Sequence, residues 1–268
     1  GASLAASGTV NLATGATLDL SAGSGTQQFG TLVGNGTVNL GANSIEVGGA
    51  TDGTFSGSIA GTGGLTKVGA GIETLTGANT YTGGTFINAG TLAIGPGGSL
   101  AATGAVTLTA AGTGFDISTA GANQTIGALN GVAGSTVSLG AQTLTLGGVG
   151  NSIFDGAISG TGGLVKNGAG SLTLGGANLF SGGVALNGGA LVVGNNAALG
   201  SGALTVGSNA TLDASTGVSL ANSINLASGA NLDLLGSQAL TLGGVISGTG
   251  GLIKDGAATV TLSGANTY

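Results

Sequence analysis

A long block of sequence occurs three times in this chain, and this repetition limits the folds that the chain can adopt. The first copy, GSIAGTGGLTKVGAGIETLTGANTYTGGTFINAGTLAIG, covers residues 57–95, and the second, GAISGTGGLVKNGAGSLTLGGANLFSGGVALNGGALVVG, covers residues 156–194. A third copy begins at Gly244 and reaches Tyr268. Such repeats are typical of solenoids, in which each unit buries its apolar face only against its neighbours.

The similarity extends beyond these blocks. The related segments LGANSIEVGG, LGAQTLTLGG and LGSQALTLGG precede the three copies. The sequence therefore predicts one continuous solenoid segment of about two and three-quarter long repeats, at residues 1–96, 97–196 and 197–268. Both ends fall inside repeating sequence, so we expect the chain to be a fragment of a longer protein.

Short segments with a period of two predict the secondary structure. Leu or Val lies on one face of each segment and Thr, Asn, Asp or Ser on the other, as in half-buried strands. Clusters of Gly and Asn between them predict tight turns. Strands this short are stable only when successive turns stack, so the sequence predicts an all-β parallel β-solenoid. The segments are TVNL (9–12), TLDL (17–20), TVNL (37–40), VTLT (106–109), TVSL (136–139), TLTL (143–146), SLTL (171–174), ALTV (203–206), NLDL (231–234) and TVTL (259–262).

The composition excludes several classes of protein. Among 268 residues there are 62 glycines, and neither histidine nor cysteine is present. This excludes disulfides, the usual zinc ligand sets and Ser-His-Asp catalysis. Three lysines against nine acidic residues cannot neutralise a run of phosphates, which excludes nucleic acid as a partner. An apolar content of 41% with low net charge argues against disorder, and no apolar run approaches the ~20 residues of a membrane-spanning helix.

The repeated block resembles the autotransporter-associated β-strand repeat, also called the passenger-associated transport repeat, of bacterial type V secretion systems. The resemblance is carried by GTGGLTKVGAG and ETLTGANTYTGGTFINAGTLAIG in the first copy and by the matching residues of the others. It implies a right-handed parallel β-helix that is secreted or displayed on the bacterial cell surface. It also implies export through an outer-membrane β-barrel translocator in the same parent chain.

Three lysines, Lys67, Lys166 and Lys254, occupy the same position in the three copies. One hypothesis makes them a ladder that binds anionic glycans. The favoured interpretation is structural, with each ammonium group bonding turn carbonyls or reaching solvent at a corner. Their wide separation along the chain would place them several turns apart, too far to share one ligand.

An asparagine followed two residues later by an aromatic side chain also recurs in each copy. A sugar-binding site is one reading of this pair. The favoured reading is that the asparagine bonds its neighbouring backbone at a turn while the aromatic ring packs beneath it. Together with the lysines, these residues are predicted to be structural repeat-marker positions: Lys67, Lys166, Lys254, Asn79, Asn178, Asn266, Tyr81, Phe180 and Tyr268.

The acidic residues are the remaining candidates for catalysis, because parallel β-helices also host polysaccharide-degrading enzymes. Asp19, Asp213 and Asp233 are predicted to point outward, and the last two, 20 residues apart, to stack on neighbouring turns. No arginine or histidine is present to complete a catalytic set. We therefore predict no enzymatic activity and no catalytic, cofactor or metal site. The other aspartates share no register; they are Asp52, Asp116, Asp155 and Asp255.

Glu73 occupies a position that is Leu172 in the second copy and Val260 in the third. This position should face the core, where an unpaired carboxylate is costly. The favoured expectation is a local bulge that turns Glu73 outward. The alternative is that Lys67 approaches it.

Together these features predict a structural β-helical rod of an autotransporter-like protein. Such a rod would support adhesion, aggregation or biofilm formation and its own export. An alternative is the repeat unit of a self-assembling extracellular fibre, because nearly uncharged strand edges favour end-to-end self-association. A weaker alternative is a polysaccharide-active β-helix enzyme. Host or cell-surface glycans are further candidate partners.

Overall fold

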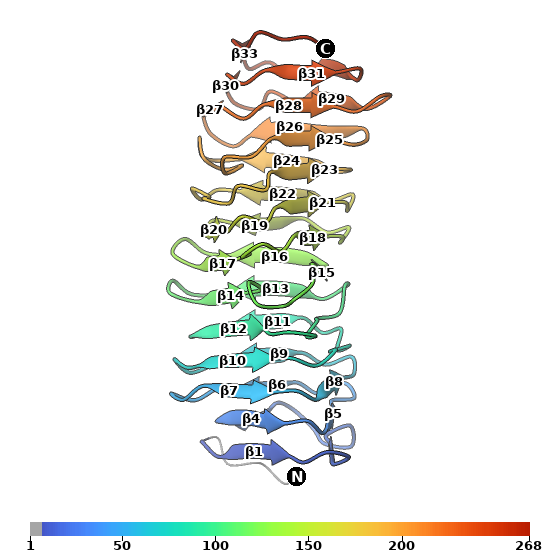
Figure 1. Cartoon of the computed structure of the whole chain (residues 1–268), viewed down its shortest axis with the longest axis vertical. Helices are drawn as coiled ribbons and strands as arrows, with labels where there is room; N and C mark the ends of the chain where they lie inside the picture. The colour runs from blue at the N-terminus through green and yellow to red at the C-terminus, as the bar shows by residue number, and fades with distance from the viewer. Residues whose placement is uncertain (1–6) are drawn as a thin grey trace. The chain divides into compact units, whose positions relative to one another are not determined.

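The computed structural model describes residues 7–268, so the first residues of the first predicted repeat, 1–6, lie outside it. Within residues 7–268 every regular element is a β-strand, and no helix is present that could cross a membrane. The strands pair in parallel with those of the turns before and after them. The fold is an all-β solenoid of about 13 turns (Figure 1), which confirms the predicted fold class.

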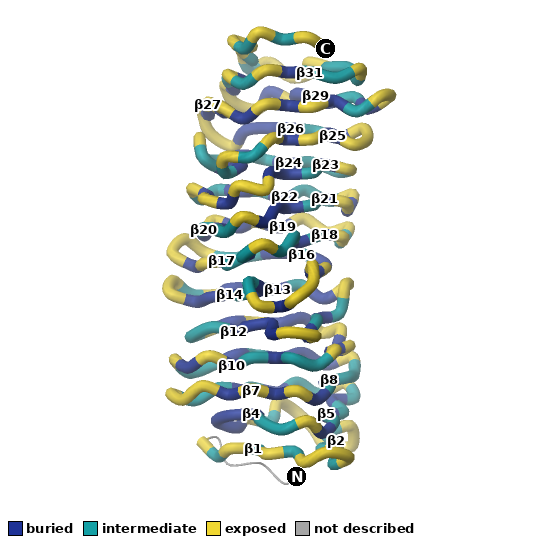
Figure 2. Tube along the Cα trace, in the orientation of Figure 1, coloured by how far each residue is buried: buried dark blue, intermediate teal, exposed yellow. Residues whose placement is uncertain are grey.

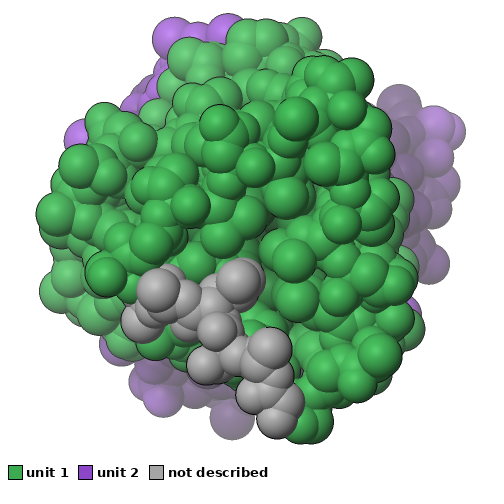
Figure 3. Space-filling model, turned by 90° about the horizontal axis from the view of Figure 1, so that it is seen from below, with its two compact units in different colours: residues 1–138 green, residues 139–268 purple. Residues whose placement is uncertain are grey.

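The chain divides into two compact units, residues 1–138 and 139–268, coloured separately in Figure 3. In the first unit, strands form three parallel ladders in the orders β1-β4-β7-β10-β12-β14-β17, β3-β6-β9-β11-β13-β16 and β2-β5-β8. Paired residues lie 18 to 23 positions apart, which is the length of one turn. The strands are β1 (Thr9–Leu12), β2 (Thr17–Asp19), β3 (Gln27–Phe29), β4 (Thr31–Gly34), β5 (Thr37–Asn39), β6 (Ile45–Val47), β7 (Gly53–Phe55), β8 (Ser58–Ala60), β9 (Leu65–Lys67), β10 (Ile72–Leu75), β11 (Thr85–Ile87), β12 (Thr91–Ile94), β13 (Ala105–Leu108), β14 (Gly114–Asp116), β15 (Gln124–Ile126), β16 (Ala128–Gly131) and β17 (Thr136–Ser138).

The second unit repeats this arrangement. Its ladders run β18-β21-β23-β25-β28-β31, β19-β22-β24-β26-β29-β32 and β27-β30-β33. Paired residues lie 19 to 22 positions apart. The strands are β18 (Leu144–Leu146), β19 (Ser152–Phe154), β20 (Ala157–Ser159), β21 (Leu164–Lys166), β22 (Ser171–Leu174), β23 (Val184–Leu186), β24 (Ala190–Val193), β25 (Leu204–Val206), β26 (Ala210–Ala214), β27 (Val218–Leu220), β28 (Ile224–Leu226), β29 (Asn231–Leu234), β30 (Leu240–Leu242), β31 (Ile246–Gly248), β32 (Gly251–Lys254) and β33 (Val260–Leu262).

The core is built from side chains that stack turn upon turn. Because side chains alternate across a strand, every second residue faces inward and lies over its register partner on the next turn. One such column in the second unit consists only of buried aliphatic residues: Leu144, Leu164, Val184, Leu204, Ile224 and Ile246. Figure 2 shows the resulting alternation of buried strand residues with exposed turns.

Each of the ten segments with period-two alternation contains a strand at the predicted place. Many other strands have sequences too short and too rich in glycine to show a period. Examples are β7 (GTF), β16 (ALNG) and β31 (ISG). These strands are held by pairing with the neighbouring turns rather than by a local pattern.

Candidate functional site

Lys67 is a fully buried lysine in a core-facing position of β9. Its register partners are Val47 and Ile87, both core residues. The ammonium group donates to the carbonyl oxygens of Val68 at 2.7 Å, Gly69 at 2.8 Å and Ala89 at 3.2 Å. Burial lowers the pKa of Lys67, and nearby Glu73 and Asp52 partly oppose this shift. The lysine therefore satisfies carbonyl groups of two turns from inside the core.

The backbone packs closely around this ammonium group at Gly48. A Cβ atom there would lie 1.8 Å from the Val68 carbonyl oxygen and 3.0 Å from the Lys67 Nζ atom, and the residue has a φ of +133°. Only glycine fits this position without displacing the turn that binds the lysine.

The other two lysines make the same kind of contact in the second unit. Lys166, in β21, is buried between Leu146 and Leu186, and burial lowers its pKa. Its ammonium group donates to the carbonyl groups of Gly168 and, at 3.3 Å, Gly188. Lys254, in β32, is exposed and donates to the carbonyl groups of Asp255 and, at 2.9 Å, Gly256.

Lys166 and Lys254 belong to different ladders of the second unit. Lys166 lies in the ladder that contains β21, and Lys254 in the one that contains β32. The two ammonium groups are thus on different sheets, and both are bonded to their own turns. This arrangement does not form a ladder of cations for an extended anionic glycan.

Asn79 connects three successive turns. Its Oδ1 atom accepts a hydrogen bond from the Ile59 N–H at 3.0 Å, and its Nδ2 atom donates to the carbonyl oxygens of Gly77 at 2.8 Å and Ser99 at 3.0 Å. The residue is only 2% exposed. Its partners therefore include backbone groups 20 residues before and after it, beyond the neighbouring backbone that the sequence indicated.

The same connection recurs in the second unit. Asn178 accepts from the Ile158 N–H at 2.8 Å and donates to the Ala198 carbonyl at 2.6 Å. Asn266 accepts from the Ile246 N–H at 2.8 Å. Sequence analysis missed Asn222, which donates to the carbonyl groups of Gly200 at 3.0 Å and Gly202 at 2.7 Å. Asn222 has no aromatic residue two positions later, so the repeated pattern gave no signal for it.

The aromatic residues that follow these asparagines differ in burial. Tyr81 and Phe180 are buried, whereas Tyr268 is 48% exposed. The Tyr81 hydroxyl lies 2.7 Å from the Thr85 hydroxyl, and burial raises the pKa of Tyr81. In the second copy both members of this pair are apolar, because Phe180 replaces the tyrosine and Val184 the threonine. A buried hydroxyl needs a partner, so the two positions change together.

The Tyr81→Phe variant is expected to lower the free energy of unfolding by about 1–2 kcal/mol, because it leaves the buried Thr85 hydroxyl without its partner. Adding Thr85→Val should recover most of this loss by reproducing the apolar pair of the second copy. Urea unfolding followed by circular dichroism measures both variants. A double variant less stable than Tyr81→Phe alone would contradict this coupling.

Glu73 faces the core, so the expected bulge is wrong. β10 pairs with β12 residue for residue over its whole length, and Glu73 is 1% exposed. Gly53, its register partner on the preceding turn, makes room for the carboxyl group: a Cβ atom at Gly53 would lie 2.5 Å from Glu73 Oε2. The carboxyl group accepts the backbone N–H of Leu32, while Oε1 has no partner among the described residues.

Burial raises the pKa of Glu73 to about 8, although the Leu32 N–H and Lys67 act against this shift. The alternative expectation, an approach by Lys67, agrees with this electrostatic interaction. All three ammonium bonds of Lys67 nevertheless go to carbonyl groups. Glu73 is thus a buried acid that is predominantly protonated near neutral pH.

Asp213 and Asp233 do not stack directly, contrary to prediction. Asp233 is paired with Thr211 and Ile253, whereas Asp213 is paired with Val192. The register places the two aspartates two positions apart, because the turn between them is longer than 20 residues.

Asp213 is also buried, although it was predicted to point into solvent. Ser237 covers it, donating from its N–H at 2.9 Å and from its hydroxyl at 2.6 Å. Asp19, in contrast, is exposed as predicted, and hydrogen bonds from Ser21 and Asn39 lower its pKa. No group of three or more acidic residues that could hold a metal ion occurs in the described part of the chain.

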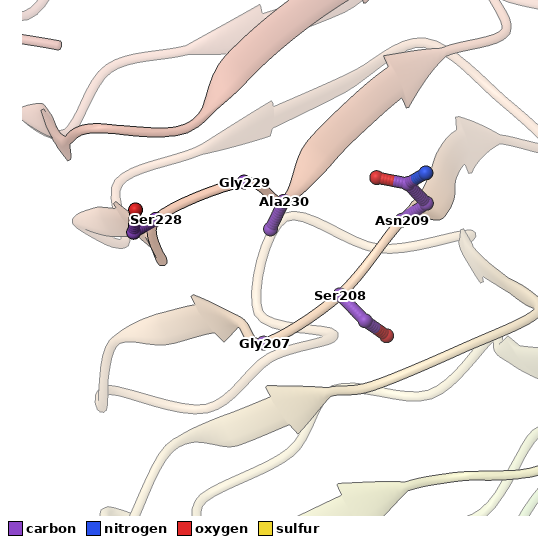
Figure 4. Close-up of a pocket in the computed structure, with 6 residues that line it drawn as sticks. All are labelled: Gly207, Ser208, Asn209, Ser228, Gly229 and Ala230. Carbon is purple, nitrogen blue, oxygen red and sulfur yellow. The ribbon is translucent and has the colours of Figure 1, made fainter.

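A hollow lies around Asp233 on the outer face of β26, β29 and β32. It has a volume of about 270 Å³ and includes Thr211, Asp233 and Ile253, which stack on consecutive turns. An adjoining hollow of about 370 Å³ lies between residues 207–209 and 228–230 (Figure 4). Asn209 lines both. Sequence analysis did not anticipate this pair of hollows, because neither the register nor the turn geometry is visible in the sequence.

Comparison with known proteins identifies the repeated segments. Residues 65–94, 164–193 and 252–268 match the family described as Passenger-associated-transport-repeat. The three lysines occupy the third position of these three matches. No curated protein and no solved structure matches the chain. The chain thus carries three segments of the passenger-associated transport repeat, the family that its sequence resembles.

Proposed function

We propose that this chain is a structural segment of an autotransporter passenger, secreted or held at the bacterial surface. The observation that carries the proposal is the position of the family matches, which coincide with stacked turns of the solenoid. They cover β9–β12, β21–β24 and β32–β33. As a β-helical rod, such a segment would carry adhesive or aggregating parts away from the cell and support biofilm formation.

Folding would also assist export through the outer-membrane β-barrel translocator of the parent chain. Each turn needs only the preceding turn to complete its backbone ladder and its core columns. Turns that emerge from a pore can therefore fold one after another. A folded turn is too wide to return through the pore, which favours movement outward.

We further propose that the nine repeat-marker positions serve the solenoid and not a ligand, within long repeats at residues 1–96, 97–196 and 197–268. The hydrogen bonds of Lys67, Lys166, Asn79 and Asn178 to backbone groups of neighbouring turns support this role. A ligand would have to displace these bonds.

Export can be tested with the chain fused between a secretion signal and an autotransporter barrel in a Gram-negative host. Leu164→Asp, which places a charge in a core column, is expected to reduce the protease-accessible surface fraction severalfold. Val165→Asp, on the outward side of the same strand, is the matched control and should be displayed like the parent. Equal display of both variants would contradict a role for folding in export.

We also propose that the chain does not hydrolyse polysaccharides. Asp213 is held by Ser237, and Asp233 lies on a different column, so the two carboxylates are not arranged as a stacked catalytic pair. Incubation of the purified chain with a panel of neutral and acidic polysaccharides should release no reducing ends. Activity that disappears in Asp213→Asn or Asp233→Asn would establish the enzyme alternative.

A self-assembling extracellular fibre is the second candidate. The small number of charged residues, 12 in the whole chain, favours it because little repulsion opposes association. Electron microscopy of the native material distinguishes the candidates. Stalks anchored at cells support the passenger, and continuous filaments of uniform width support the fibre.

A further inference from the structure

The Asp233 side chain contains a buried oxygen with an unfilled hydrogen-bonding capacity. Its Oδ1 atom is buried and has no partner within residues 7–268. Burial raises the pKa of Asp233, and Asp255 and Asp213 add to the shift while Lys254 opposes it. A buried acceptor without a donor is unfavourable unless a ligand or water supplies one.

Uncharged polar groups and one apolar side chain surround this oxygen. Thr211 precedes Asp233 in the outward column, and Ile253 follows it with 47% of its surface exposed. On the adjacent column, Asn209 accepts a hydrogen bond from the Asn231 N–H at 2.9 Å. Asn231 is followed one turn later by Gly251, which has no side chain to fill the space. The hollow therefore combines acceptors, donors and an apolar wall.

The hollow extends toward the neighbouring corner of the solenoid. Residues 207–209 and 228–230 follow one another on two successive turns, with Ser208 and Ser228 at the sides (Figure 4). The Ser208 hydroxyl already donates to the Asn187 carbonyl group. The two hollows, about 270 and 370 Å³, lie near the lower end of the ~300–1,000 Å³ that is usual for ligand sites. An extended ligand can occupy both by passing over Asn209.

The charges select against an anionic ligand. Asp213, Asp233 and Asp255 interact with one another at this site. The one basic residue among them, Lys254, donates to the carbonyl groups of Asp255 and Gly256. A ligand must therefore be neutral, donate hydroxyl groups and present an apolar C–H face to Ile253. Saccharides without carboxylate or sulfate groups have this chemistry.

We propose that these two hollows bind a neutral oligosaccharide, with Asp233 Oδ1 accepting a sugar hydroxyl and Ile253 contacting a sugar ring. The proposal rests on the extracellular role proposed above, because only an exposed segment meets surface glycans. Binding is measured on the purified chain, so a failure of binding is distinguishable from a failure of export.

The test follows the amide resonances of the ¹⁵N-labelled chain during titration with cellotetraose or maltotetraose. At least one of them should shift amides within residues 207–211, 228–233 and 251–253. Asp233→Ala should weaken binding about tenfold or more, because the orphan acceptor is removed. Asp19→Ala is the matched control: Asp19 also follows Leu in a strand, but its carboxylate is exposed and bonded to Ser21, so binding should not change.

Calcium chloride and trigalacturonate are titrated in parallel. Shifts produced by calcium with none from either tetrasaccharide would replace the saccharide site with a cation site. Shifts spread over other turns, stronger binding of trigalacturonate, or no shift with either neutral sugar would overturn the proposal. If Asp233→Ala does not fold, Thr211→Val, which removes a neighbouring hydroxyl at nearly constant volume, is expected to weaken binding severalfold; unchanged affinity would count against the site.

Discussion

Glu73→Leu is expected to make the chain more stable at pH 9 by about 5 kcal/mol and to have little effect at pH 4. The acid has a pKa of about 8 in the folded state and a usual value of 4.5. Between these values the folded state holds a proton that the unfolded state releases, so stability falls as pH rises from about 4.5 to 8. The change follows from about 1.4 kcal/mol for each pKa unit.

Leucine is the appropriate replacement because Leu172 holds this position in the second copy, and because Gly53 leaves room beside it. Urea unfolding at a series of pH values measures the effect. Glu73→Gln should remove the same pH dependence without adding apolar surface. Glu46→Gln, on the outward side of β6, is the control and should preserve the slope of the parent. A parent chain as stable at pH 9 as at pH 5 relative to Glu73→Gln would show that Glu73 is not a buried acid.

Asn178→Ala is expected to lower the free energy of unfolding by about 3 kcal/mol. The side chain is 2% exposed and bonds the Ile158 N–H and the Ala198 carbonyl, so alanine leaves two backbone groups without partners. Each buried unsatisfied group costs about 1–3 kcal/mol. Hydrogen exchange should show the loss first at the Ile158 amide, because that amide loses its acceptor.

Asn167→Ala provides the comparison for this variant. Asn167 accepts a hydrogen bond from the Asn187 side chain at 2.9 Å, but this contact is exposed to solvent. Its loss should change stability by less than about 0.5 kcal/mol. Similar losses for Asn167→Ala and Asn178→Ala would mean that the asparagine between turns has no special role.

Local sequence predicted the features that depend on alternation. Leu and Val at every second position of TVNL or SLTL are sufficient to place a strand and its buried face. The three-fold recurrence of the long block then required these strands to stack. Parallel pairing and the solenoid followed from these two facts.

The errors concern residues whose partners lie one turn away. Glu73 faces inward because Gly53, 20 residues earlier, leaves a space that only the register reveals. Asp213 is buried because Ser237, in a later turn, folds over it. Both depend on turn length, which varies among corners and leaves no signal in a strand's own sequence.

The placement of Lys166 and Lys254 on different ladders has a consequence for recognition. The spacing between these two copies is not a whole number of turns, so equivalent side chains of the second unit point in different directions around the axis. An antibody or receptor that approaches this unit from one side meets a given motif once, not as a regular array. Avidity for a repeated epitope would therefore require a partner that reaches around the solenoid, or another copy of the chain.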